Sequence, residues 1–109
     1  MTEITPADLD ALLTGSDDED VLVIDVRTRP EFEISHIPGS VNIPFLELTD
    51  SIGDRCIPAT VVLVCEVGVA SEQAARLVEA YEGVGSDTTV AHLAGGIREW
   101  DGPLEPPED

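Results

Sequence analysis

Short, nearly continuous apolar runs recur along the chain, and segments with helical spacing lie between them. Runs of this length that are rich in β-branched residues are typical of strands covered on both faces, as in a parallel sheet. The predicted strands span residues 21–25, 41–43, 60–64 and 88–93. Because strands that alternate with helices need crossover connections, the pattern predicts an α/β fold with a mainly parallel sheet.

The helices of the first half are predicted from their capping residues. One begins at Pro6, with Thr5 as its cap, and ends at Gly15. A shorter helix follows the first strand, where Thr28 and Glu31 resemble a capping box.

The second half contains one longer predicted helix. It begins at Ser71 as the cap and continues to about residue 82. Its apolar face is predicted from the spacing i, i+3, i+4, i+7 at Ala74, Leu77, Val78 and Tyr81. A last short helix is predicted to contain Ile97 and Trp100.

Charge is the least ordinary property of the composition. The 109 residues carry 23 acidic side chains against 5 arginines and no lysine, so the formal net charge is −18 at pH 7. Such a surface repels itself in dilute buffer, whereas in ~1 M salt the Debye length falls to about 3 Å and screens the repulsion. The composition therefore predicts a salt-adapted, halophilic protein, and it argues against nucleic acid and membranes as partners.

The length supports one compact domain over residues 1–109, with a core at about 5–104 and an acidic, proline-rich tail at 105–109. No stretch approaches the ~20 apolar residues of a membrane span, and the first residues do not resemble a signal peptide. We therefore expect a cytoplasmic protein that is a monomer or a homodimer. Cys56 and Cys65 form neither a disulfide framework nor a zinc site, so no metal and no cofactor is expected.

Cys65 directly follows the predicted strand 60–64, and the residues after it lead into a helix. Ligands of open parallel sheets bind beyond the carboxyl ends of the strands, so this cysteine lies where a site is expected. If the loop wraps around the sulfur, its inward N–H groups and the positive end of the helix favour thiolate over thiol. Gly68 permits the backbone angles of such a tight loop.

A sulfur anion surrounded by N–H donors can attack a sulfane sulfur and hold it as a persulfide, without a metal or a histidine base. The predicted substrate-binding loop comprises Glu66, Val67, Gly68, Val69, Ala70 and Ser71. From the residues alone, the alternative is that Cys65 is a small buried apolar side chain at a strand end.

Three segments resemble motifs of the rhodanese-like family, in matching order and spacing over about residues 8–104. The motifs are Asp-Val-Arg at 25–27, Glu-Phe at 31–32, His-Ile-Pro-Gly at 36–39, Asn-Ile-Pro at 42–44, the cysteine loop at 65–71, Gly-Gly at 95–96, Trp at 100 and Gly-Pro at 102–103.

The resemblance implies a three-layer α/β/α sandwich and a sulfurtransferase with Cys65 as the catalytic nucleophile. The enzyme would move sulfur from thiosulfate or a persulfide donor to cyanide or to a thiol, either a small molecule or a protein. The six-residue loop at 65–70 is similar to that of sulfurtransferases, whereas related phosphatases carry a longer loop. The alternative is a rhodanese-like binding or regulatory module with weak or no catalysis.

The loop also departs from the family pattern. Thiosulfate users of the family usually carry basic residues there, often an arginine at the position of Ala70. Glu66 stands where a neutral or basic residue is more usual, and it would oppose the thiolate if it pointed inward. The departures make thiosulfate a doubtful donor.

The remaining chemically notable residues are interpreted as structural rather than catalytic. They are Asp25, Arg27, His36, His92 and Trp100. Cys56 is interpreted as a passive small residue, with a resolving thiol as the alternative.

Overall fold

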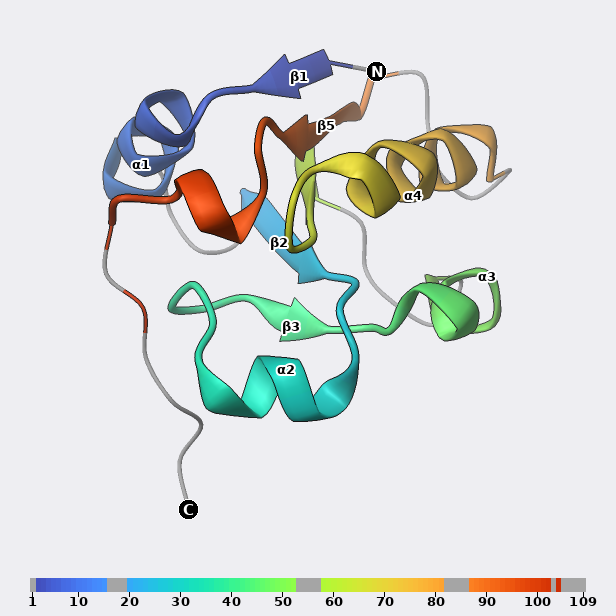
Figure 1. Cartoon of the computed structure of the whole chain (residues 1–109). Helices are drawn as coiled ribbons and strands as arrows, with labels where there is room; N and C mark the ends of the chain where they lie inside the picture. Colours follow the sequence, from blue (N-terminus) through green and yellow to red (C-terminus); the bar gives the residue numbers. More distant parts are fainter. Residues whose placement is uncertain (1, 16–19, 53–57, 82–86, 103, 105–109) are drawn as a thin grey trace.

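The computed structural model describes residues 2–15, 20–52, 58–81, 87–102 and 104. At its centre is a five-stranded sheet with the strand order β1-β5-β4-β2-β3, in which every neighbouring pair is parallel (Figure 1). The strands are β1 (Thr2–Ile4), β2 (Val21–Asp25), β3 (Val41–Asn42), β4 (Thr60–Val64) and β5 (Thr89–Leu93). The predicted α/β fold with a mainly parallel sheet is therefore confirmed.

The two central strands align residue by residue, from Val21 beside Thr60 to Asp25 beside Val64. Because the strands are parallel, their carboxyl ends meet at one edge of the sheet. The residues that follow β2 and β4 are therefore brought together, although they lie far apart in the sequence.

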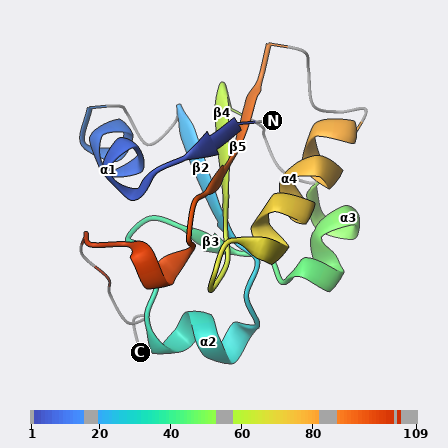
Figure 2. The same ribbon diagram turned by 45° about the horizontal axis from the view of Figure 1, so that its top comes forward.

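Helices cover both faces of this sheet (Figure 2). The helical elements are α1 (Pro6–Gly15), α2 (Arg29–Ile34), η1 (Phe45–Glu47), α3 (Leu48–Ser51), α4 (Val69–Ala80) and η3 (Ile97–Glu99). On one face, α3 and α4 contribute Leu48 and Val78 to a buried cluster with β2 and β4. On the other, Leu9 of α1 and Ile97 of η3 are buried against the sheet. The result is the three-layer sandwich that the resemblance implies.

The buried face of α4 is rotated slightly from the predicted one, so the prediction is wrong for part of the helix. The buried residues of the helix are Ser71, Ala74, Ala75 and Val78, whereas Leu77 and Tyr81 are 41% and 38% exposed. Mostly small side chains therefore face the sheet. The spacing of large apolar residues, from which the face was predicted, does not reveal this.

The predicted start of α4 is also wrong. The helix begins at Val69 with Gly68 as its N-cap, so Ser71 lies in the first turn and is completely buried. The edge strand β1 and the segment formed by η1 and α3 were not predicted. Cys56 and the tail at 105–109 lie outside the described residues.

None of the helices in the described ranges is long and apolar enough to cross a lipid bilayer.

Candidate active site at the end of strand β4

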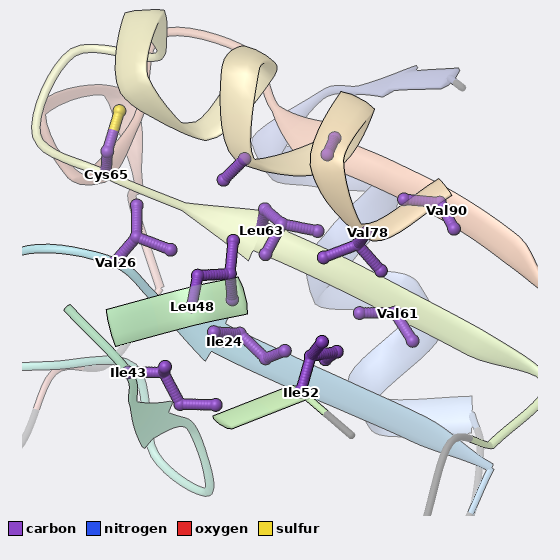
Figure 3. Close-up of a cluster of buried hydrophobic side chains, with 12 residues drawn as sticks. Ile24, Val26, Ile43, Leu48, Ile52, Val61, Leu63, Cys65, Val78 and Val90 are labelled. Atoms are coloured by element: carbon purple, nitrogen blue, oxygen red, sulfur yellow. The ribbon is translucent and has the colours of Figure 1, made fainter. Parts of the chain in front are cut away.

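Cys65 is the first residue after β4, at the edge of the sheet where the strands end. Its side chain is only 4% exposed and belongs to the cluster of buried side chains between the sheet and α4. Figure 3 shows it at one end of this cluster, with the sulfur turned toward the loop that leads into α4. The strand thus fixes the base of the side chain, and the loop surrounds its sulfur.

Two groups of the loop reach the sulfur. The backbone N–H of Gly68 donates a hydrogen bond to Cys65 Sγ at 3.0 Å. The hydroxyl oxygen of Ser71 lies 3.4 Å from the same sulfur, where it accepts from the thiol or donates to a thiolate. Among the described loop residues, these are the predicted site residues that contact Sγ directly.

The shape of the loop depends on Gly68, which has a φ of +93°. This left-handed conformation turns the chain sharply before α4 and directs the glycine N–H at the sulfur. Because α4 begins at the next residue, the partial positive charge of its N-terminus also lies beside Sγ. The loop and the helix start therefore both direct N–H groups or positive charge toward this sulfur.

The opposite side of the loop is held by the segment that follows β5. Ile97 N–H donates to the Cys65 carbonyl at 2.8 Å, and Arg98 N–H donates to the Glu66 carbonyl at 3.2 Å. A Cβ on Gly96 would lie 2.5 Å from both carbonyl oxygens, so only glycine permits this approach. The Gly-Gly pair was recognised as a motif, but its role as the support of the cysteine loop appears only in the structure.

Glu66 does not stand alone beside the sulfur. One carboxylate oxygen lies 3.7 Å from Arg27 Nη1, and the other lies 3.3 Å from Arg98 Nε. The carboxylate is therefore placed between two guanidinium groups, which compensate part of its negative charge. This arrangement weakens the expected opposition of Glu66 to a thiolate.

Arg27 is fixed at the end of β2 by Asp25. Its Nη2 donates to one carboxylate oxygen at 2.8 Å, its Nε donates to the other at 3.0 Å, and Nη2 also donates to the Ser35 carbonyl. Both side chains are buried, with Arg27 8% and Asp25 1% exposed. Burial alone would lower the pKa of Arg27, but the hydrogen bond and charge of Asp25 outweigh it and raise that pKa.

A cavity of about 400 Å³ opens above Cys65. Its walls come from the end of β2, the start of α2, the cysteine loop and the first turns of α4: Val26, Arg27, Thr28, Glu31, Cys65, Glu66, Val67, Val69, Ala70 and Gln73. Val67 and Val69 are 49% and 64% exposed, so aliphatic surface faces solvent beside the sulfur. Arg27, for which the sequence predicts a structural role, is also part of the cavity wall.

The other residues interpreted as structural are all buried. The ring of His36 stacks on Phe32 with centroids 3.9 Å apart, and its Nδ1 lies 3.0 Å from the Phe32 carbonyl oxygen. His92 lies within β5 at 6% exposure, and Trp100 packs against the α1 side of the sheet at 7% exposure. In the described part of the chain, no three His, Cys, Asp or Glu side chains gather closely enough to hold a metal ion.

Known proteins resemble this chain over most of its length. The sequence model of the rhodanese-like domain family matches residues 5–102. A putative sulfur carrier protein of Bacillus subtilis strain 168, YrkF, is 33% identical over 88 residues, which cover 81% of this chain and 45% of that protein. A tRNA sulfurtransferase of Thermoplasma acidophilum is 36% identical over 69 residues, covering 63% of this chain and 14% of that protein. The chain thus spans less than half the length of these curated relatives.

Solved structures share the fold. A rhodanese-like domain protein from Staphylococcus aureus is 28% identical, with a TM-score of 0.80 over 99% of this chain and 100% of that chain. A thiosulfate sulfurtransferase from Pseudomonas aeruginosa has a TM-score of 0.81 at 24% identity, covering 96% of this chain and 19% of that chain. The fold and the family model agree, and this chain belongs to the rhodanese-like domain family.

Proposed function

We propose that this domain is a sulfurtransferase that carries sulfane sulfur as a persulfide on Cys65. The observation that carries the proposal is the hydrogen bond from Gly68 N–H to Cys65 Sγ, within a loop that opens to a cavity. A small buried cysteine of purely structural role needs neither a left-handed glycine aimed at its sulfur nor a cavity above it. The relatives described as a sulfur carrier and a tRNA sulfurtransferase support the same chemistry.

The first step loads sulfur on the protein. The Cys65 thiolate attacks the outer sulfur of a donor, the new Sγ–S bond forms, and the S–S bond of the donor breaks. With thiosulfate, the sulfite dianion leaves with the electron pair. With an organic persulfide R–S–SH, the thiolate R–S⁻ leaves and takes up the proton, so that Cys65–S–S⁻ remains.

The second step regenerates the Cys65 thiolate. An acceptor thiolate attacks the outer sulfur of Cys65–S–S⁻, the Sγ–S bond breaks, and the electron pair returns to Sγ. Cyanide accepts in the same way and leaves as thiocyanate. We propose a thiol, on a small molecule or a protein, as the natural acceptor, because the aliphatic rim at Val67 and Val69 can pack against the body of a thiol carrier.

The loop backbone provides a place for the charge of the persulfide. The carbonyls of Cys65 and Glu66 point toward η3, where Ile97 and Arg98 bind them. Because trans peptide units direct N–H opposite to C=O, the N–H groups of Glu66 and Val67 face away from η3. We infer that these two N–H groups donate hydrogen bonds to the outer sulfur of the persulfide, while Gly68 N–H donates to Sγ.

The test is sulfur loading, defined as the gain of one sulfur atom in the intact mass of the protein. The protein is incubated in molar KCl with thiosulfate or with a small alkyl persulfide, and the Cys65→Ser variant is treated in parallel. We expect loading of the wild type by at least the persulfide, reversal by a thiol or cyanide, and no loading of Cys65→Ser.

Absence of loading with every donor would overturn the proposal and favour a binding or regulatory module. The low exposure of Cys65, 4%, is the observation that favours this second function. Loading that persists in Cys65→Ser would assign the chemistry to another residue.

A further inference from the structure

The carboxylate of Glu66 and the guanidinium of Arg27 meet at the wall of the cavity, close to the reactive sulfur. We propose that Glu66 is an internal anion that occupies Arg27 and thereby selects organic persulfides with an apolar substituent over thiosulfate. The inference rests on the proposed function, because it names the donor class of the same site.

The cation that a small anionic donor would need is already bound. Arg27 is the only cationic side chain among the described residues that line the cavity. Its Nε and Nη2 donate to Asp25 and to the Ser35 carbonyl, and its remaining nitrogen, Nη1, lies 3.7 Å from Glu66. Every nitrogen of this guanidinium therefore has an oxygen partner within the chain.

The negative charge of Glu66 is held in this position from two sides. Arg98 approaches the second carboxylate oxygen from η3 at 3.3 Å, while the Glu66 carbonyl accepts the Arg98 backbone N–H. Backbone and side chain thus fix Glu66 next to the cysteine. A dianion that enters the cavity must displace this carboxylate from Arg27 or remain beside it without a compensating cation, and like charges at short range oppose each other.

The aliphatic part of the rim suits a different donor. Val67 and Val69 are 49% and 64% exposed, and Val26 and Ala70 extend the aliphatic wall. An alkyl or aryl group next to the persulfide sulfur would lose contact with water against these side chains. An organic persulfide carries at most one negative charge, against two on thiosulfate, and that charge lies on the sulfur that the loop amides receive.

The experiment compares the two donors on Glu66→Gln and Glu66→Ala, at one fixed KCl concentration. The rate of sulfur loading on Cys65 gives kcat/KM for thiosulfate and for a small alkyl persulfide. We expect both variants to raise kcat/KM for thiosulfate about tenfold or more, mainly through a lower KM. The reason is that Arg27 Nη1 loses its carboxylate partner and becomes available to the anionic donor. The value for the alkyl persulfide is expected to change by a smaller factor than the value for thiosulfate, since its apolar contacts remain.

Glu72→Gln is the matched control. Glu72 also pairs with an arginine, Arg76 at 3.9 Å, and it lies on α4 just after the cysteine loop but outside the cavity wall. The substitution changes the net charge by the same amount without freeing Arg27. It is expected to leave the preference between the two donors unchanged.

Three results would overturn the inference. They are an unchanged donor preference in both Glu66 variants, an equal gain with both donors, and an equal gain for thiosulfate in Glu72→Gln. In each case the wild type and the variants still load sulfur, so the proposed function stands. Failure of every protein to load from either donor contradicts the proposed function itself.

Discussion

The carboxyl ends of β2 and β4 lie side by side, and their polar atoms differ in how many bonding partners they have. After β2, the Asp25–Arg27 pair is buried and both carboxylate oxygens accept from the guanidinium, while Asn42 Nδ2 donates to the backbone carbonyls of both residues. After β4, the Cys65 sulfur has one N–H at 3.0 Å, one hydroxyl at 3.4 Å and a cavity above it.

The contrast predicts different consequences of substitution at the two strand ends. In a buried ion pair, removal of either partner leaves an uncompensated charge, so the pair contributes to stability. A sulfur with few partners and an open side can form a new bond. We therefore expect substitutions after β2 to act on stability, and substitutions after β4 to act on sulfur loading.

The largest effect is expected from Asp25→Ala, which leaves the Arg27 guanidinium buried without its carboxylate. Loss of one partner of a buried pair lowers the free energy of unfolding by about 3–5 kcal/mol. Cys65→Ala removes a small buried side chain and is expected to lower it by only about 1 kcal/mol. Urea unfolding in molar KCl measures both values.

A double variant provides the control for this prediction. Asp25→Ala combined with Arg27→Met removes both charges and should recover part of the stability lost in Asp25→Ala alone. Equal losses in Asp25→Ala and Cys65→Ala would erase the proposed contrast between the two strand ends.

An intermediate effect is expected from Gly68→Ala, compared with Gly39→Ala. Both glycines are left-handed, with φ of +93° and +83°, so alanine is strained at either position by about 1–2 kcal/mol. A Cβ at Gly68 also lies 3.0 Å from Gly95 N, whereas a Cβ at Gly39 has no atom within 4 Å. Gly68→Ala should therefore be less stable than Gly39→Ala and should load sulfur more slowly.

The loading rate decides the interpretation of this pair. If Gly39→Ala loads sulfur as slowly as Gly68→Ala, backbone strain anywhere in the fold is sufficient, and the loop geometry has no special role. A normal rate in Gly68→Ala would show that the N–H direction at this glycine is not needed.

The smallest effect concerns Glu31, at the start of α2. The Thr28 hydroxyl donates to its carboxylate at 2.9 Å, the Thr28 N–H donates at 3.2 Å, and these bonds hold the pKa of Glu31 below its ordinary value. A lowered folded pKa stabilises the protein above the unfolded pKa of about 4.5, and this stabilisation is lost as the pH falls through the folded pKa.

Glu31→Gln should therefore be less stable than wild type near neutral pH, and the difference should close in acid. Urea unfolding at pH 7 and pH 3 measures it, with Glu33→Gln, an exposed residue of the same helix, as the control. A difference between wild type and Glu31→Gln that is equal at both pH values would show that the charge of Glu31 is not responsible.

Local patterns predicted the parts of the fold that local forces determine. The strands β2 and β4 have the predicted bounds, because their apolar runs are nearly continuous and rich in β-branched residues. By contrast, β1 has three residues, two of them exposed, and its pairing from Thr2 beside Ala91 to Ile4 beside Leu93 depends on a partner distant in sequence. No local periodicity exists in so short a segment.

The site was predictable to a similar degree. The position of Cys65 and the need for a left-handed glycine follow from the order strand, loop, helix. The pairing of Glu66 with Arg27 and Arg98 does not, because it joins three segments that meet only in the folded sheet. The sequence therefore indicates the acid next to the cysteine but not the two cations that pair with it.

Two backbone amides of η3 report whether the cysteine loop stays in contact with that segment. Ile97 N–H and Arg98 N–H are bonded to carbonyls of the loop, at Cys65 and Glu66. Their hydrogen exchange with solvent requires that the loop separate from η3. Exchange at these two positions, followed by NMR before and after sulfur loading, would therefore measure how far a persulfide stabilises the closed loop without any label on the cysteine itself.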